Sequence, residues 1–212
     1  MKILAVVAHY DDLELSAGGT IAKFIKQGHQ VRVVTATKSN YTDYTGKVLR
    51  DNIDAAIEGL QSLVTLGVQA AVNLGYDTKN IPFNSEIVEK INKEIDKYQP
   101  DIVITHALNE SHQDHFNLAK SVMAAARYQK TIWMFETLYP SKTSTQQFRP
   151  LIYIDITDTF DIKMKALKDQ KSQWQKYPHW SDLVTSLARV RGIEIGTEYA
   201  ECFDIIKMEY II

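Results

Sequence analysis

The first twelve residues of the chain read MKILAVVAHYDD, and this stretch decides the fold. Residues 3–8 form an apolar run of strand length that stops directly at the polar residues 9–12. A short, continuously apolar run is typical of a strand covered on both faces, as in a parallel sheet. We therefore expect an α/β protein in which this strand lies in the middle of the sheet.

Short apolar runs continue to alternate with helical patterns along most of the chain, which is typical of βαβ units. We predict a Rossmann-like, mostly parallel sheet flanked by helices, with strands in the 3-2-1-4-5 type of order. Residues 1–212 are expected to form a single domain, because no linker or repeat divides them. Strands are predicted at residues 3–8, 31–36, 70–74, 102–105, 132–135, 151–156 and 203–212, and helices at 17–27, 47–64, 84–98, 116–128, 158–176 and 183–190.

The composition is that of an ordinary soluble globular protein, with 45% hydrophobic and 24% charged residues. A formal net charge of −2 gives no electrostatic argument for binding nucleic acid or an anionic membrane. The apolar run at residues 3–8 is too short for a membrane span and has no cleavage pattern of a signal peptide. One cysteine, Cys202, excludes an internal disulfide. We therefore expect a cytoplasmic protein without a membrane span.

Two clusters of histidine and acid follow predicted strands. Residues 9–12 (His-Tyr-Asp-Asp) follow the first strand, and residues 112–115 (His-Gln-Asp-His) come shortly after the fourth. In the predicted order these two strands are neighbours, and the connection reverses direction between them. Ligands bind at the carboxyl ends of strands at such a switch point. We therefore expect the two clusters to meet, although each alone is also typical of a turn or a helix start.

The combined residue types are those of a catalytic zinc site. Such a site needs three protein ligands from His and Asp or Glu, and an open position for water. It also needs a free carboxylate that takes a proton from the water, and a group that stabilises the oxyanion. Two histidines and one aspartate as ligands would leave acids in the clusters for the proton transfer. The inventory therefore favours metal-dependent hydrolysis.

The two motifs resemble those of the PIG-L or LmbE-like zinc N-deacetylases. The family pattern Ala-His-Pro-Asp-Asp-x-Glu followed by Gly-Gly is similar to residues 8–14 (Ala-His-Tyr-Asp-Asp-Leu-Glu) with Gly18-Gly19. The family pattern His-x-Asp-His matches residues 112–115. The resemblance implies removal of an N-acetyl group from a small molecule or glycoconjugate that contains an amino sugar. It also implies Zn²⁺ as the cofactor, with Fe²⁺ as an alternative metal.

The resemblance assigns roles residue by residue. It implies that the metal ligands are His9, Asp12 and His115. It further implies that Asp11 is the general base, that His112 stabilises the oxyanion, and that Asp114 holds and charges His112.

Other positions match the family less closely. Tyr10 stands where the family usually has proline. Arg50 and Asp77 are the candidate substrate-binding residues, Arg50 on a looser match of spacing than Asp77. Specificity is expected to lie in the loops at residues 37–46, 78–83 and 137–149.

Other functions agree with parts of the same pattern. Two histidines and one carboxylate also form the facial triad of a non-haem Fe(II) enzyme. A Rossmann-like small-molecule binding protein without catalysis is a second alternative, and a phosphoesterase would require a second metal and more acids. Asp11, an extra acid beside the triad, favours hydrolysis. The expected partner is an N-acetylated sugar, with no nucleic acid, and a homo-oligomer remains open.

Overall fold

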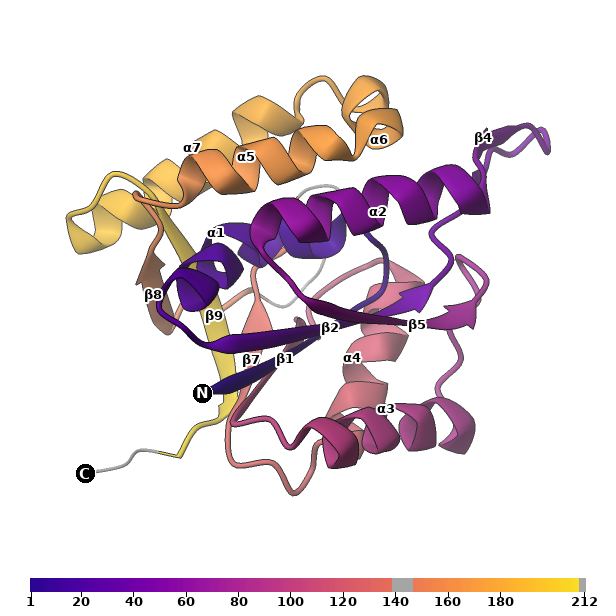
Figure 1. The fold of residues 1–212 in the computed structure, drawn as a ribbon, viewed down its shortest axis with the longest axis horizontal. Coiled ribbons are helices and arrows are strands. Elements are labelled where there is room, and N and C mark those ends of the chain that lie inside the picture. The colour runs from indigo at the N-terminus through magenta and orange to yellow at the C-terminus, as the bar shows by residue number, and fades with distance from the viewer. Residues whose placement is uncertain (139–146, 210–212) are drawn as a thin grey trace.

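The computed structural model of the chain describes residues 1–138 and 147–209. Nine strands and seven helices form within these residues (Figure 1). The strands are β1 Lys2–Val7, β2 Gln30–Thr37, β3 Tyr41–Thr42, β4 Val48–Arg50, β5 Ala70–Tyr76, β6 Ile102–His106, β7 Ile132–Phe135, β8 Ile152–Asp155 and β9 Ala200–Lys207. The helices are α1 Asp12–Lys26, α2 Asn52–Leu66, α3 Ser85–Tyr98, α4 Gln113–Ala125, α5 Phe160–Asp169, α6 Lys171–Lys176 and α7 Trp180–Ile195.

The central sheet has seven strands in the order β5-β2-β1-β6-β7-β9-β8. The first five are parallel and correspond to the predicted 3-2-1-4-5 order, which is therefore confirmed. β9 and β8 extend the sheet as antiparallel strands beyond β7. Because β1 pairs with β2 on one side and with β6 on the other, the switch point lies at the carboxyl ends of β1 and β6.

Successive side chains of β1 point to opposite faces of the sheet and build two cores. Ile3 and Val7 pack in one apolar cluster with residues of α1, α2 and α5. Leu4 and Val6 pack in the other with residues of α3 and α4. Helices therefore cover both faces, as Figure 1 shows, and this explains why residues 3–8 are apolar without interruption.

The segment before α2 differs from the prediction. Residues 47–50, predicted as the start of a helix, belong to a two-stranded antiparallel hairpin of β3 and β4. The helix begins only at Asn52, because the side chain of Asp51 accepts hydrogen bonds from the backbone N–H groups of Ile53 and Asp54 at 2.8 Å each. This N-cap fixes the boundary. Figure 1 shows the hairpin projecting beside α2.

Two further segments depart from the predicted boundaries. The helix predicted at residues 158–176 is interrupted at Gln170, and α5 and α6 lie on its two sides. The buried side chain of Gln170 donates to the carbonyl oxygen of Tyr10 at 2.9 Å and to Ser62 Oγ at 3.0 Å. These hydrogen bonds attach the interruption between α5 and α6 to the loop after β1 and to α2. The strand predicted at residues 203–212 begins earlier, as β9, and its last three residues lie outside the described part of the chain.

Candidate metal centre and substrate cavity

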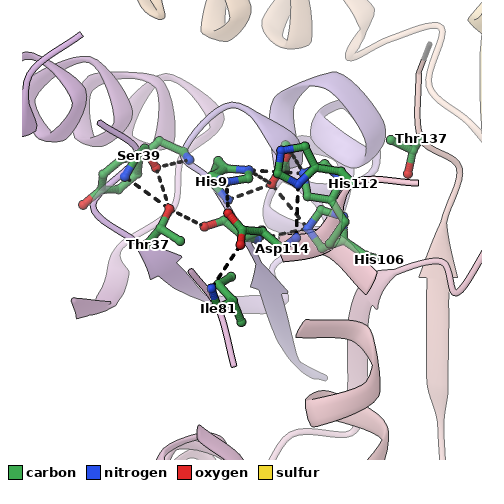
Figure 2. Close-up of polar contacts among 12 residues, drawn as sticks. His9, Thr37, Ser39, Ile81, His106, His112, Asp114 and Thr137 are labelled. Atoms are coloured by element: carbon green, nitrogen blue, oxygen red, sulfur yellow. Dashed lines mark hydrogen bonds and ion pairs between the residues drawn. The ribbon is translucent and has the colours of Figure 1, made fainter. Parts of the chain in front are cut away.

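The two histidine-acid clusters meet at the switch point of the sheet. His9 and Asp11 follow β1, and Asp12 is the first residue of α1. His112 is the N-cap of α4, and His115 lies in the first turn of that helix. Neighbouring parallel strands thus deliver both clusters to one edge, as the topology predicts (Figure 2).

Three side chains converge closely enough to bind one metal ion. His9 Nδ1 lies 3.2 Å from His115 Nε2, His115 Nε2 lies 3.2 Å from Asp12 Oδ1, and His9 Nδ1 lies 3.3 Å from Asp12 Oδ2. Ligands at about 2.0–2.1 Å from a tetrahedral zinc ion are separated by about 3.3 Å. The two distances to Asp12 end on different oxygens of its carboxylate, so the three groups surround one point at about the spacing of tetrahedral ligands.

Each of the two histidines in this triad also contacts a carboxylate through its other ring nitrogen. His9 Nε2 lies 3.1 Å from Asp114 Oδ2, and His115 Nδ1 is hydrogen-bonded to Glu110. Carboxylates in this position are characteristic of metal-binding histidines, because they fix the tautomer and orient the ring. Burial alone would raise the pKa of Glu110, but His115 and His106 outweigh it and lower the pKa to about 2. Glu110 is therefore an ionised carboxylate.

His106 and Glu110 are part of the site, although the sequence assigns a role to neither: Thr105-His106 resembles a family flank of the second motif, and Glu110 belongs to no motif. Within the described residues, two groups of side chains are close enough to hold a metal ion: His9, His112 and His115, and Asp12, His106 and His115. The triad above takes its members from both groups, so His106 is a further candidate ligand. His106 Nε2, however, accepts the backbone N–H of Ala8 at 3.0 Å. Its Nδ1 then carries the proton and donates to Glu110 Oε1 at 3.2 Å. With both nitrogens engaged, His106 positions the ligands and has no lone pair left for a metal.

Asp11 lines the cavity beside the triad. Burial, followed by the charge of Asp12, raises the pKa of Asp11 above its usual range, while Arg50 and His9 act in the opposite direction. A carboxylate with a raised pKa is a stronger base near neutral pH than an ordinary aspartate.

His112 is held by the start of α4. Its Nδ1 accepts the backbone N–H of Asp114 at 3.2 Å, so the proton of the neutral ring lies on Nε2. Burial, and then the charges of His115 and His9, lower the pKa of His112 to about 4. The carboxylate of Asp114 contacts His9 and accepts the backbone N–H of Ile81 at 3.1 Å (Figure 2). It also accepts the backbone N–H of Lys79 at 2.6 Å. The expected carboxylate contact from Asp114 to His112 is thus replaced by one to His9.

The triad opens into a cavity of about 200 Å³. All three loops expected to shape specificity contribute to its wall, and residues 139–146 of the third lie outside the described part of the chain. Besides the clusters, the wall includes Leu15, Ser16, Ser39, Asn40, Tyr41, Arg50, Thr78, Lys79, Thr137, Leu138, Gln173, Lys176, Tyr177 and Trp180.

The two candidate substrate-binding residues have different positions. Arg50 is 3% exposed, lines the cavity, and contacts Glu58 at 3.2 Å and Gln170 at 2.6 Å. Its buried Nε has no hydrogen-bond partner among the described residues. Asp77 is exposed, pairs with Lys38 at 2.8 Å and is not part of the described cavity wall. The structure therefore brings Arg50 to the site but not Asp77.

Comparison with known proteins identifies the family. The family described as GlcNAc-PI de-N-acetylase, PIG-L, matches residues 4–126. The uncharacterized deacetylase YaiS of Escherichia coli is 30% identical over 178 residues, which cover 80% of this chain and 90% of YaiS. The chain therefore belongs to the PIG-L family, and the resemblance inferred from the two motifs is confirmed. The family's activity class, de-N-acetylation, agrees with the function predicted from the sequence.

Solved structures show the same architecture. An N,N'-diacetylchitobiose deacetylase from Pyrococcus horikoshii superposes with a TM-score of 0.82 at 26% identity, and the match covers 97% of this chain and 83% of that one. GalB, a 4-carboxy-2-hydroxymuconate hydratase from Pseudomonas putida, superposes with a TM-score of 0.85 at 19% identity, over 100% and 98% of the two chains. The GalB likeness concerns the fold alone, so the activity has to be argued from the site.

Proposed function

We propose that this chain hydrolyses the N-acetyl amide of an amino-sugar compound at one divalent metal ion held by His9, Asp12 and His115. The spacing of 3.2–3.3 Å between the three ligating groups is the observation that carries the proposal. Neutral imidazole and carboxylate ligands suit zinc and leave Fe²⁺ as an alternative. When bound, the ion would lower the pKa of a water molecule and polarise the amide carbonyl.

The remaining residues then have separate tasks. Asp11 takes the proton from the attacking water and passes it to the leaving nitrogen, which its position in the cavity and its raised pKa support. His112 donates its Nε2–H to the carbonyl oxygen as negative charge develops there. Asp114 orients a metal ligand, because its carboxylate is hydrogen-bonded to the ring of His9.

The cavity wall supplies the contacts to the sugar. Arg50 is the assigned substrate residue, because it lines the cavity and Glu58 and Gln170 fix its guanidinium there. A sugar hydroxyl is a suitable acceptor for such a donor. Asp77 is left out of this assignment because it pairs with Lys38 outside the cavity wall.

We further propose that residues 1–212 work as one catalytic domain in the cytoplasm. The continuous seven-stranded sheet supports a single domain, because strands from both ends of the chain belong to it. Cys202 is free and buried, which agrees with a reducing compartment. Among the helices of the described residues, none has the length and apolar character needed to cross a membrane.

The direct test is acetate release from a panel of N-acetylated amino sugars by zinc-loaded protein. Asp11→Asn should keep its metal and lose activity by about 10²–10⁴-fold, the range for a positioned acid-base group. His115→Ala should lose the metal itself, as measured by elemental analysis. Equal metal content in wild-type protein and His115→Ala would remove His115 from the ligand set. Metal loss in Asp11→Asn would mean that Asp11 and Asp12 have exchanged roles.

A further inference from the structure

One end of the cavity is cationic. Lys79 and Lys176 both line it, beside Tyr41 at the start of the projecting hairpin. The Nζ of Lys176 lies 3.5 Å from the centre of the Tyr41 ring, and the Nζ of Lys79 lies 4.8 Å from it. Two ammonium groups from distant parts of the chain thus share one aromatic ring.

Neither ammonium group is neutralised within the described part of the chain. Lys79 Nζ donates to the carbonyl oxygen of Thr42 at 3.3 Å, and no carboxylate lies within ion-pair distance of Lys79 or Lys176 there. The acids of the cavity wall are Asp11 and Asp12, which belong to the metal centre. Like charges placed together without counter-charges repel one another, so this arrangement favours an anionic ligand.

The backbone at Lys79 adds a second, independent observation. Its φ is 71°, in the left-handed region that glycine adopts most easily. A lysine there is strained, and strained residues that persist cluster at functional sites. Its backbone N–H donates to Asp114 Oδ2 at 2.6 Å, and the same oxygen contacts His9 Nε2. The backbone of Lys79 is therefore linked to the proposed metal ligand His9 through one oxygen of Asp114.

The Tyr41 ring contacts both ammonium groups, so a cation occupies at least one of its faces. An ammonium group lies against the ring, so a sugar ring cannot stack on that face. A cation–π contact orients an ammonium group but uses none of its N–H groups as conventional hydrogen-bond donors. The donors of Lys176 therefore remain available for an acceptor in the cavity.

We propose that the substrate is an amino-sugar compound with an anionic substituent, a carboxylate or a phosphate, and that Lys79 and Lys176 bind this group at the Tyr41 end of the cavity. The proposal rests on the deacetylase function above and specifies its substrate class. Both lysines are exposed, so each is expected to contribute about tenfold to the preference for the anion, the lower end of the range for a hydrogen bond to a charged group.

The test compares glycosides of N-acetylglucosamine that differ only in charge. The carboxymethyl glycoside is paired with the neutral carbamoylmethyl glycoside, and N-acetylglucosamine 1-phosphate with the methyl glycoside. Wild-type protein should deacetylate the anionic member of at least one pair with a kcat/KM about 100-fold higher, and added salt should reduce this ratio. The pair with the larger ratio distinguishes a carboxylate from a phosphate.

Variants identify the binding groups. Lys79→Met and Lys176→Met should each reduce the ratio about tenfold, the double variant should abolish it, and Lys79→Arg should largely restore it. Lys38→Met is the matched control, because Lys38 is also a partly exposed lysine of this region but is paired with Asp77. Its ratio should equal that of the wild type.

The outcomes separate the two proposals. Equal kcat/KM within both pairs, or a preference that survives in the double variant, overturns the anion subsite while the deacetylase function stands. No acetate from any glycoside overturns the deacetylase function. In that case, calorimetric binding of the same glycosides to Asp11→Asn protein tests the anion subsite independently of catalysis. Tighter binding of the anionic glycoside that is lost in the lysine variants supports the subsite. Equal binding within both pairs rejects it.

Discussion

Replacing Gly59 in α2 by alanine should displace the loop that carries the proposed metal ligands His9 and Asp12. Tyr10, between His9 and Asp11, packs directly against this glycine and is 8% exposed. A Cβ added at Gly59 would lie 2.3 Å from Tyr10 Cγ, where unstrained carbon contacts are about 3.5–4.0 Å. The ring would have to move by more than about 1 Å, taking the backbone between a ligand and the proposed base with it.

The magnitude follows from two opposing terms. Alanine in a helix interior is favoured over glycine by about 1 kcal/mol, whereas overpacking a tight contact costs about 1–3 kcal/mol. A contact as short as this one belongs at the upper end of that range. We therefore expect a net loss of about 1–2 kcal/mol, which for a chain of this length lowers Tm by roughly 2–8 °C. Misplacement by about 1 Å should also reduce kcat/KM by about 10²-fold.

Thermal unfolding, metal content and kcat/KM of Gly59→Ala are the measurements. Gln61→Ala is the matched control, because Gln61 is an exposed residue of the same helix and its change should stay within about 0.5 kcal/mol. Truncating the ring removes the two shortest contacts and leaves the one to Tyr10 Cβ at 2.7 Å, so Gly59→Ala should cost less stability in a Tyr10→Ala background than in the wild type. If Gly59→Ala behaves like Gln61→Ala in both stability and activity, the packing of Tyr10 on α2 does not position the metal loop.

Three further predictions concern other parts of the molecule. Glu110→Gln should weaken metal affinity about 10–100-fold in a chelator competition, since Glu110 contacts both His106 and His115, whereas exposed Glu86→Gln should not. Lys163→Met should destabilise the fold by about 3 kcal/mol in denaturant unfolding, because it leaves the buried Glu201 without its cation, whereas the same change at exposed Lys26 should cost under about 1 kcal/mol. Burial raises the pKa of the Cys202 thiol to about 12, so the thiol stays protonated and a mass-spectrometric labelling assay should find it inert from pH 7 to 9 until the protein unfolds. Labelling of the native protein that goes to completion, at a rate that levels off near pH 9 as for an ordinary thiol, would contradict this.

The sequence predicts the part of this structure that depends on periodicity and topology. The apolar run at residues 3–8 identifies a strand buried on both faces, and the alternation after it fixes the order of the parallel strands. Once the order is known, the convergence of residues 9–12 and 112–115 follows, because both leave carboxyl ends of neighbouring strands. The family match agrees with this reasoning.

What the sequence does not predict depends on tertiary contacts of single side chains. Gln170 divides a predicted helix through hydrogen bonds to a loop 160 residues away in the chain. Glu110 lies in a short connection with no periodic pattern. In the fold the rings of His106 and His115 stack with their centres 4.1 Å apart, and each ring is hydrogen-bonded to the Glu110 carboxylate. The family-like spacing around Asp77 is kept, but the side chain turns to Lys38 instead of the cavity. Local patterns carry no information about such partners.

The tautomer of His112 changes the chemistry expected of the site. An aspartate two residues away in sequence suggests an imidazolium, because a carboxylate favours the charged ring. In the fold the backbone N–H of Asp114 points at His112 Nδ1, and the carboxylate turns away to His9. Burial of His112 and the positive end of α4 then oppose a proton on Nδ1. In the proposed mechanism His112 is therefore a neutral donor through Nε2. Asp114 contacts the proposed metal ligand His9 and accepts the backbone N–H of Lys79. One acidic residue thus couples the metal centre to the cationic end of the cavity, which its position in the sequence motif alone does not reveal.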